Sequence, residues 1–179
     1  MKKLCMILPL ALILCFMVGC QDKEAMAELE EMKAQAEVEE QNKALINNYF
    51  KEMDSGNFDF VMGAFASDAR IFFPSGSTTP MPMDEVFHGL KSFYEAFPDY
   101  KHDLKEMIAE GDIVIVRTID SGTHEGEFMG IPATGNKFEV GAVIIFHIKD
   151  GKIVEFWEEM DMLGLMMHLG MVKRKEAEK

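Results

Sequence analysis

The dipeptide Asp150-Gly151 separates two long apolar runs, and it constrains the fold more than any other feature of the chain. Asp-Gly between such runs is a strong signal for a two-residue β-hairpin turn. Counting outward from that turn sets Ile144 opposite Trp157. We therefore expect the last two strands of an antiparallel sheet at residues 137–148 and 152–160.

Residues directly opposite each other share one face of a sheet, so this register predicts what the face carries. On the first strand its members are Phe138, Val140, Ala142, Ile144, Phe146 and Ile148. On the second strand they are Ile153, Glu155, Trp157, Glu159 and Asp161. The sequence thus predicts three carboxylates facing an apolar wall.

An earlier hairpin turns at Glu110-Gly111-Asp112, and a two-residue loop there defines a second shared face. That face carries His102, Leu104, Glu106 and Ile108 with Ile113, Ile115, Arg117 and Ile119. A longer loop or a bulge would break this grouping.

Helices are expected before these strands. Residues 20–55 contain neither Gly nor Pro and are rich in good helix formers, which predicts a long helix. Only its second half has an apolar stripe that can pack on a domain, at Leu45, Ile46, Tyr49, Phe50 and Met53. Shorter elements follow: helices at 58–65 and 83–97, and strands at 70–73, 100–109 and 112–128. Helices followed by an antiparallel meander predict an α+β domain.

Charge and cysteine placement exclude several function classes. With 18 basic and 31 acidic residues, the net charge of −13 argues against a nucleic-acid binder. A composition that is 48% hydrophobic and 27% charged fits a folded domain. Because Cys5, Cys15 and Cys20 all lie near the amino terminus, the domain has no disulfide, thiolate metal site or cysteine nucleophile.

The amino terminus has the pattern of a secretory leader: Lys2 and Lys3 precede an apolar run at residues 4–18. The end of the run, Met17-Val18-Gly19-Cys20, resembles a bacterial lipoprotein lipobox. The resemblance implies cleavage before Cys20, lipidation of Cys20 and export to the cell membrane through a lipid anchor. An uncleaved anchor or a plain secreted protein are the alternatives. The expected organisation is a signal peptide (1–19), an acidic helical tether (20–40), one domain (41–170) and a charged tail (171–179).

Three segments in order resemble the SnoaL-like polyketide cyclases, or ester cyclases, of the nuclear transport factor two-like superfamily. They are Phe97-Pro98-Asp99-Tyr100 with His102, residues 121–135 around His124, and residues 150–170 with Trp157, Asp161 and Leu169-Gly170. The resemblance implies a cone-shaped α+β fold, in which three helices wrap a curved antiparallel sheet and enclose a pocket.

The resemblance also implies a chemistry. In the family, an aspartate four residues after a tryptophan takes a proton from carbon and starts an aldol ring closure, and Asp161 and Trp157 match that pair. The expected donors to the enolate oxygen are His124, His102 or Arg117, among which the sequence does not choose. The expected substrate-binding wall comprises Trp157, Glu159, Val140, Ala142, Ile144 and Phe146.

The residues leave other interpretations open. Asp161 directly precedes a helical run, so one alternative is that it caps that helix and has no catalytic role. Trp157 can likewise be a simple core residue. The glutamates beside Trp157 share no face with a histidine, so neither a metal site nor a cofactor is expected. The expected partner is a small hydrophobic molecule, together with a second copy of the chain bound through the outer sheet face. The alternative function is a non-catalytic surface lipoprotein that binds a hydrophobic ligand in the same pocket.

Overall fold

The computed structural model of the chain describes residues 4–74 and 76–172, with side chains described from residue 23 onward. Cys20 and the predicted signal peptide therefore lie outside the described side chains, and most of the predicted tail lies outside the described residues. Internal contacts divide the chain into two units, Met1–Val38 and Glu39–Lys179. No helix in the described part of the chain is both long enough and apolar enough to cross a membrane.

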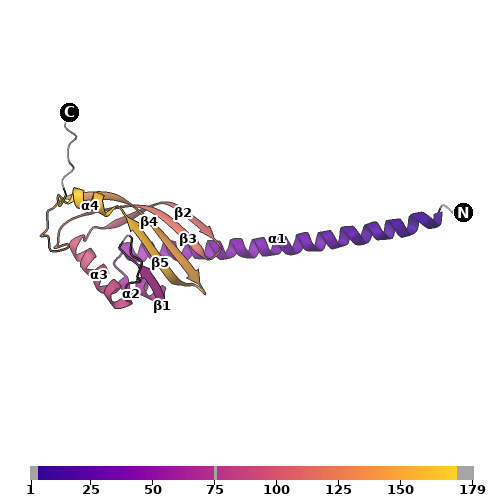
Figure 1. The fold of residues 1–179 in the computed structure, drawn as a ribbon, viewed down its shortest axis with the longest axis horizontal. Coiled ribbons are helices and arrows are strands. Elements are labelled where there is room, and N and C mark those ends of the chain that lie inside the picture. The colour runs from indigo at the N-terminus through magenta and orange to yellow at the C-terminus, as the bar shows by residue number, and fades with distance from the viewer. Residues whose placement is uncertain (1–3, 75, 173–179) are drawn as a thin grey trace, which may run out of the picture. The chain divides into compact units, whose positions relative to one another are not determined.

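The first helix, α1, runs from Leu4 to Asp54, and its final turns belong to the second unit. The described residues of the second unit otherwise form three short helices and five strands (Figure 1). The helices are α2 (Phe58–Gly63), α3 (Met83–Ala96) and α4 (Met162–His168). The strands are β1 (Phe65–Phe72), β2 (Lys101–Glu110), β3 (Ile113–Thr123), β4 (Lys137–Lys149) and β5 (Lys152–Met160).

The strands form one curved sheet in the order β1-β5-β4-β3-β2 (Figure 1). β2 to β5 form the antiparallel meander that the two turns predict, and the α+β class is confirmed. Two details differ from expectation. β1 is longer than predicted and pairs with β5 in parallel, and β3 ends at Thr123, before the predicted end at residue 128.

The turn between β4 and β5 is the predicted one. Asp150 and Gly151 have φ angles of 51° and 70°, so both central residues adopt the left-handed conformation that a type I′ turn requires. Lys149 pairs with Lys152 beside it.

The pairing of β4 with β5 then shifts by one residue, between His147 and Ile148, and this overturns the predicted register. Ile144 lies opposite Glu158, and Trp157 lies opposite Ile145. Because side chains alternate along a strand, one extra residue in β5 exchanges its two faces from there on. The inner face of β5 therefore carries Glu158 in place of Trp157 and Glu159.

A second shift, between Leu104 and Glu106, divides the predicted face of the β2–β3 hairpin. Near the turn the prediction is confirmed, since Glu106 pairs with Arg117. Beyond the shift, His102 lies opposite Asp120. Asp120 is fully buried, whereas Arg117 is exposed, so the shift brings His102 to the inner face.

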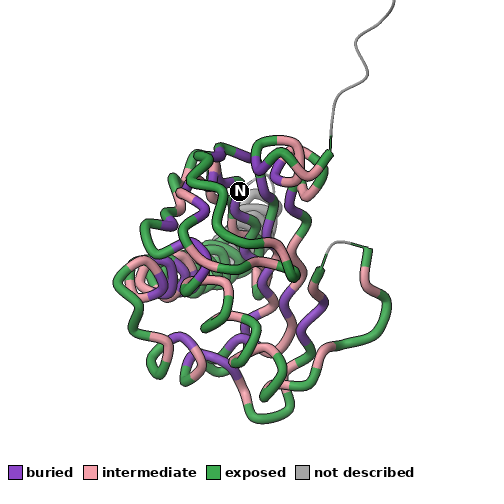
Figure 2. Tube along the Cα trace, turned by 90° about the vertical axis from the view of Figure 1, so that its left-hand side faces the viewer, coloured by how far each residue is buried: buried purple, intermediate pink, exposed green. Residues whose placement is uncertain are grey.

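The core lies between the inner sheet face and the helices. Buried residues alternate with less buried ones along β3 and β4. Figure 2 shows buried and exposed positions alternating along parts of the chain trace. At its centre, the fully buried Phe146 has edge-to-face contacts with Tyr49 and Phe50 of α1 and with Phe156 of β5. The predicted stripe of α1 thus packs on the sheet.

The outer face exposes apolar side chains, including Ile108, Ile115 and Val143. Phe156 is buried on the inner face because of the β5 shift. A homodimer through this outer face stays a prediction.

Candidate functional site

A cavity of about 530 Å³ opens between the helices and the inner face of the sheet. That volume is within the usual range for pockets that hold a small organic molecule. Most of the wall is apolar. The polar lining groups include three tyrosine hydroxyls, His102 and Glu158.

Glu158 projects into this cavity from β5, two residues before the strand ends. The side chain is half-buried, and the surrounding protein takes its carboxyl group out of bulk water. Burial raises the pKa of Glu158 to about 7, with a further increase from the negative charge of Asp120 and a smaller opposing effect of His102. A carboxylate with a pKa near neutrality is suited to general acid and base catalysis.

Asp120 lies in the middle of β3 and is fully buried. Its Oδ2 accepts a hydrogen bond from the Tyr100 hydroxyl at 2.8 Å. Burial raises the pKa of Asp120, and this increase is partly opposed by His102 and by the Tyr100 hydrogen bond. Asp120 thus fixes the Tyr100 hydroxyl at the cavity wall and adds a second carboxyl group behind that wall.

Tyr94 of α3 brings an unpaired hydroxyl to the cavity. Its Oη is buried and has no hydrogen-bond partner among the described residues. Burial raises the pKa of Tyr94, and the negative charges of Asp54, Asp120 and Glu158 raise it further, so the hydroxyl stays protonated. A buried hydroxyl without a partner is costly unless a ligand or water completes its hydrogen bond.

His102 stands in the cavity wall, as one of the donors expected from the sequence. Its Nδ1 lies 2.6 Å from Oδ1 of Asp54, the last residue of α1. The His102 backbone N–H also donates to the Asp54 carboxylate. Because a carboxylate can only accept, Nδ1 carries the proton of this contact, which fixes the orientation of the ring.

Asp161 lies elsewhere. It is exposed and does not line the cavity, because it follows Met160, the last residue of β5, and stands at the start of α4. Its Oδ1 accepts a hydrogen bond of 2.8 Å from the Gly164 backbone N–H, at the start of α4. The prediction of a pocket-facing Asp161 is therefore wrong, and the N-cap interpretation is confirmed.

We expect Asp161→Ala to lower the free energy of unfolding by about 1 kcal/mol, because the cap of α4 is lost. Asp161→Asn should change it by a few tenths of a kcal/mol, since Asn caps about as well as Asp. Urea denaturation of the two variants measures both values. Any activity of the wild-type chain should persist in Asp161→Asn, and its loss there would contradict this placement.

Trp157 and Glu159 also lie outside the cavity. Trp157 stacks on Phe72 at 3.7 Å between ring centroids, and its Nε1 donates to Oε1 of Glu155 at 2.6 Å. Oε1 of Glu159 accepts a hydrogen bond of 3.2 Å from the Gly76 backbone N–H. Both were expected in the substrate-binding wall, and the β5 shift turns both to the outer face.

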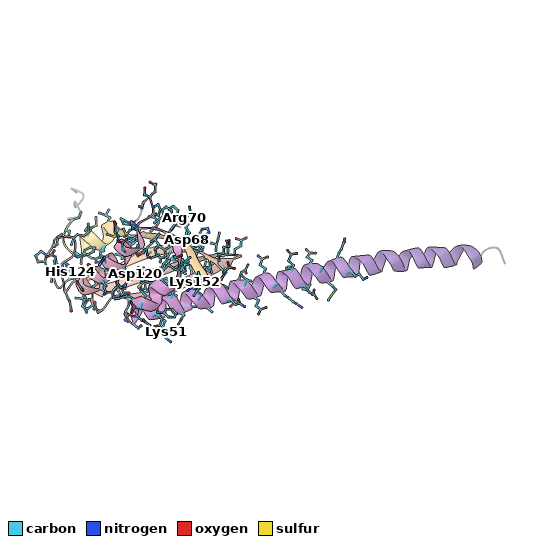
Figure 3. All side chains as sticks on the ribbon, turned by 90° about the horizontal axis from the view of Figure 1, so that it is seen from below. Lys51, Asp68, Arg70, Asp120, His124 and Lys152 are labelled. Carbon is cyan, nitrogen blue, oxygen red and sulfur yellow. The ribbon has the colours of Figure 1, made fainter. Side chains whose placement is uncertain are left out.

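The other two expected donors are not at the cavity either. Arg117 is exposed on the outer face, where its Nε donates to Glu106 at 3.0 Å. His124 is fully buried, but its Nδ1 accepts from the Thr134 backbone N–H at 3.3 Å and its ring packs against Phe97. Figure 3 labels Asp120 and His124 at separate positions in the second unit. The prediction that Arg117 or His124 faces the pocket is wrong.

The expected wall on β4 is present as core but does not line the cavity. The members of this wall are Val140, Ala142, Ile144 and Phe146. All four are buried on the inner face as predicted, but they pack behind the residues that line the cavity. Phe156 and the α1 side chains lie over this part of the sheet, and Tyr49 and Phe156 are themselves lining residues.

The site residues that were not expected from the sequence are Glu158, Asp120, Tyr94 and Tyr100. The sequence does contain one signal for Asp120. Residues 116, 118 and 120 share one face of their strand, and on that face Asp120 follows Val116 and Thr118. An ionisable residue at an inward position is rare without a function or a partner. The inward position of Glu158 has no local signal, because it depends on the bulge.

No group of three or more His, Cys, Asp or Glu side chains within the described part of the chain is arranged to hold a metal ion.

Comparisons with known proteins agree with this architecture. Residues 44–169 match the family of SnoaL-like polyketide cyclases. The structure is similar to AclR of Streptomyces galilaeus, a candidate hydroxylase, with a TM-score of 0.72 and 25% identity over 77% of this chain and 86% of that chain. It is also similar to IdmH of Streptomyces antibioticus, a candidate polyketide cyclase, with a TM-score of 0.66 and 28% identity over 73% of this chain and 99% of that chain. A search of curated protein sequences finds no significant match.

Proposed function

Because the chain belongs to the SnoaL-like polyketide cyclase family, we propose that it uses acid and base side chains to move a proton on a small hydrophobic carbonyl compound. Membership of this family suggests a function of the cyclase or isomerase type. The observation that carries the proposal is Glu158, a carboxyl group with a pKa of about 7 in the wall of an apolar cavity.

Glu158 is the proposed general base. Its ionised form takes a proton from the carbon next to a carbonyl group, and the electrons of the C–H bond form the enolate, whose negative charge rests on oxygen. Removing such a proton requires a base that is neither fully protonated nor weakly basic at the working pH. A pKa near 7 meets both conditions at neutral pH.

Tyr94 is the proposed donor to the enolate oxygen, because the Nδ1–H of His102 is already donated to Asp54. The unpaired Tyr94 hydroxyl gains the hydrogen bond that it lacks, and a donor in a water-excluded cavity stabilises developing charge strongly. Tyr100, held by Asp120, is a positioning residue in the same wall.

Two outcomes follow from the enolate. When the enolate is conjugated with a carbon–carbon double bond of the substrate, return of the proton from Glu158 to the far end of the conjugated system gives an isomer. Attack of the enolate carbon on a second carbonyl group of the same molecule forms a carbon–carbon bond, and the proton on Glu158 then goes to the new alkoxide. The second outcome is an aldol ring closure, the cyclase reaction implied by the family resemblance. Both balance without any added reagent.

Exchange of the α-protons of 2-tetralone for solvent deuterium, followed by proton NMR, tests the proposal. This bicyclic ketone is small enough for a cavity of about 530 Å³. We expect the full chain to accelerate exchange over buffer at neutral pH. If 2-tetralone binds and exchange stays at the buffer rate, the catalytic proposal fails, and the non-catalytic ligand-binding function takes its place.

We also propose that the chain is exported and anchored through lipid on Cys20. The sequence of the leader supports this, with Lys2 and Lys3 before an apolar run that ends in Gly19-Cys20.

A further inference from the structure

The charged side chains that line the cavity are all negative, apart from one histidine. The acidic lining residues are Glu85, Glu127 and Glu158. Among the lining residues that the structure describes, none is Lys or Arg. The one basic lining group, His102, is already paired with the Asp54 carboxylate.

The buried carboxyl group behind the wall strengthens this bias. Asp120 is fully buried, and its electrostatic effect reaches both Glu158 and the Tyr94 hydroxyl. Charges act more strongly where protein replaces water, so an anion entering the cavity meets repulsion that no lining cation offsets. The net charge of −13 acts in the same direction.

Aromatic rings supply much of the remaining wall. The aromatic lining residues are Tyr49, Phe65, Phe73, Phe93, Tyr94, Tyr100, Phe128 and Phe156. The faces of such rings carry partial negative charge and attract ammonium groups. The combination of aromatic rings with a carboxylate is the usual chemistry for binding an organic cation, and it offers nothing to a carboxylate or a phosphate.

We propose that the cavity selects ligands by charge, so that it binds an apolar molecule carrying an ammonium group more tightly than the neutral molecule of the same shape, and rejects the corresponding anion. The unpaired Tyr94 hydroxyl supplies a polar contact within the same wall. This inference rests on the proposed function only in taking the same cavity as the ligand site.

Three probes on one ring system test it: 2-aminotetralin as the cation, 2-tetralol as the neutral molecule and tetralin-2-carboxylate as the anion. Calorimetric titration of the full chain at pH 8 measures each affinity without any turnover. We expect affinity to fall in that order, with at least a tenfold difference between the amine and the carboxylate. Equal affinities, or tighter binding of the carboxylate, would overturn the proposal.

Two variants locate the effect. Glu158→Gln removes the charge of the one acidic lining residue, among those described, that is not exposed to solvent, and should reduce the difference between amine and carboxylate to less than threefold. Glu159→Gln makes the same chemical change one residue away, outside the cavity, and should leave the difference as it is in the wild type. If Glu158→Gln keeps the full difference, or Glu159→Gln removes it, the selectivity does not come from this cavity and the proposal fails.

The outcomes also separate this inference from the proposed function. Charge selectivity without deuterium exchange would reject the enzyme and keep the charge-selective site. Exchange with equal binding of amine and carboxylate would keep the enzyme and reject charge selection.

Discussion

Replacing Glu158 with Gln is expected to slow the exchange of 2-tetralone α-protons by about 10²–10⁴-fold, the usual contribution of a positioned general base. Gln has nearly the same shape but cannot accept the proton. Only the ionised carboxylate acts as the base, so the wild-type rate should rise with pH and level off above the Glu158 pKa of about 7. Proton NMR at a series of pH values measures both effects.

Glu159→Gln is the matched control for this prediction. Glu159 is exposed on the same strand and contacts the Gly76 backbone N–H away from the cavity. Its replacement should leave the exchange rate and its pH dependence within about twofold of the wild type. If Glu158→Gln exchanges at the wild-type rate, Glu158 is not the base.

The second large effect is on stability: at pH 8, the Glu158→Gln chain should be more stable than the wild type by roughly 2–3 kcal/mol. The folded-state pKa of Glu158 is raised to about 7 from its ordinary value of 4.5, so the folded chain binds more protons than the unfolded chain between those two values. Stability therefore falls as pH rises through that window, and above it the wild type bears the full penalty. Gln carries no charge and bears none.

Urea denaturation at pH 8 and at pH 5 measures this difference. At pH 5 folded Glu158 is mostly protonated, but the unfolded chain, with an ordinary glutamate pKa of 4.5, is already partly ionised. The difference between the two chains should therefore shrink to about 1 kcal/mol, apart from local packing effects. Glu159→Gln should show no pH-dependent difference. A gain of the same size at both pH values would show that packing, not charge, is responsible. The variant that loses activity is thus expected to gain stability, as is common for residues retained for function.

Local signals in the sequence predicted the elements well. Asp150-Gly151 defined the last hairpin because both residues tolerate positive φ, and the apolar stripe from Leu45 to Met53 identified the part of α1 that packs on the sheet. The two strands that flank the hairpin turn end within a residue of their predicted bounds. These features depend on the preferences of neighbouring residues, which the sequence states directly.

The faces of β5 could not be predicted in this way. Val154 is the residue left over by the shift in pairing, and nothing in a β-branched residue marks a bulge. Because side chains alternate between the two faces of a strand, this one extra residue places Glu158, in place of Trp157 and Glu159, on the inner face of β5. The same reason explains His102, whose inward position depends on the shift at Lys105 in β2.

The chemical character of the site could be predicted even less. The pKa values of Glu158 and Asp120 are raised because the folded chain buries both carboxyl groups, and the charge of Asp120 raises the pKa of Glu158 further. Both effects depend on the whole fold. Asp161 illustrates the converse, since its spacing after Trp157 matched the family pattern while its local position before α4 correctly indicated a cap.

The pKa of Glu158 distinguishes a general base buried in the cavity from an ordinary solvated carboxylate. Carbon-13 NMR of the glutamate side-chain carboxyl groups, titrated from pH 3 to pH 9, gives that value, and the Glu158 signal is identified by its absence from the Glu158→Gln chain. We expect a midpoint at about 7. A midpoint near the ordinary value of 4.5 would show a solvated carboxylate and would contradict a general base in the cavity.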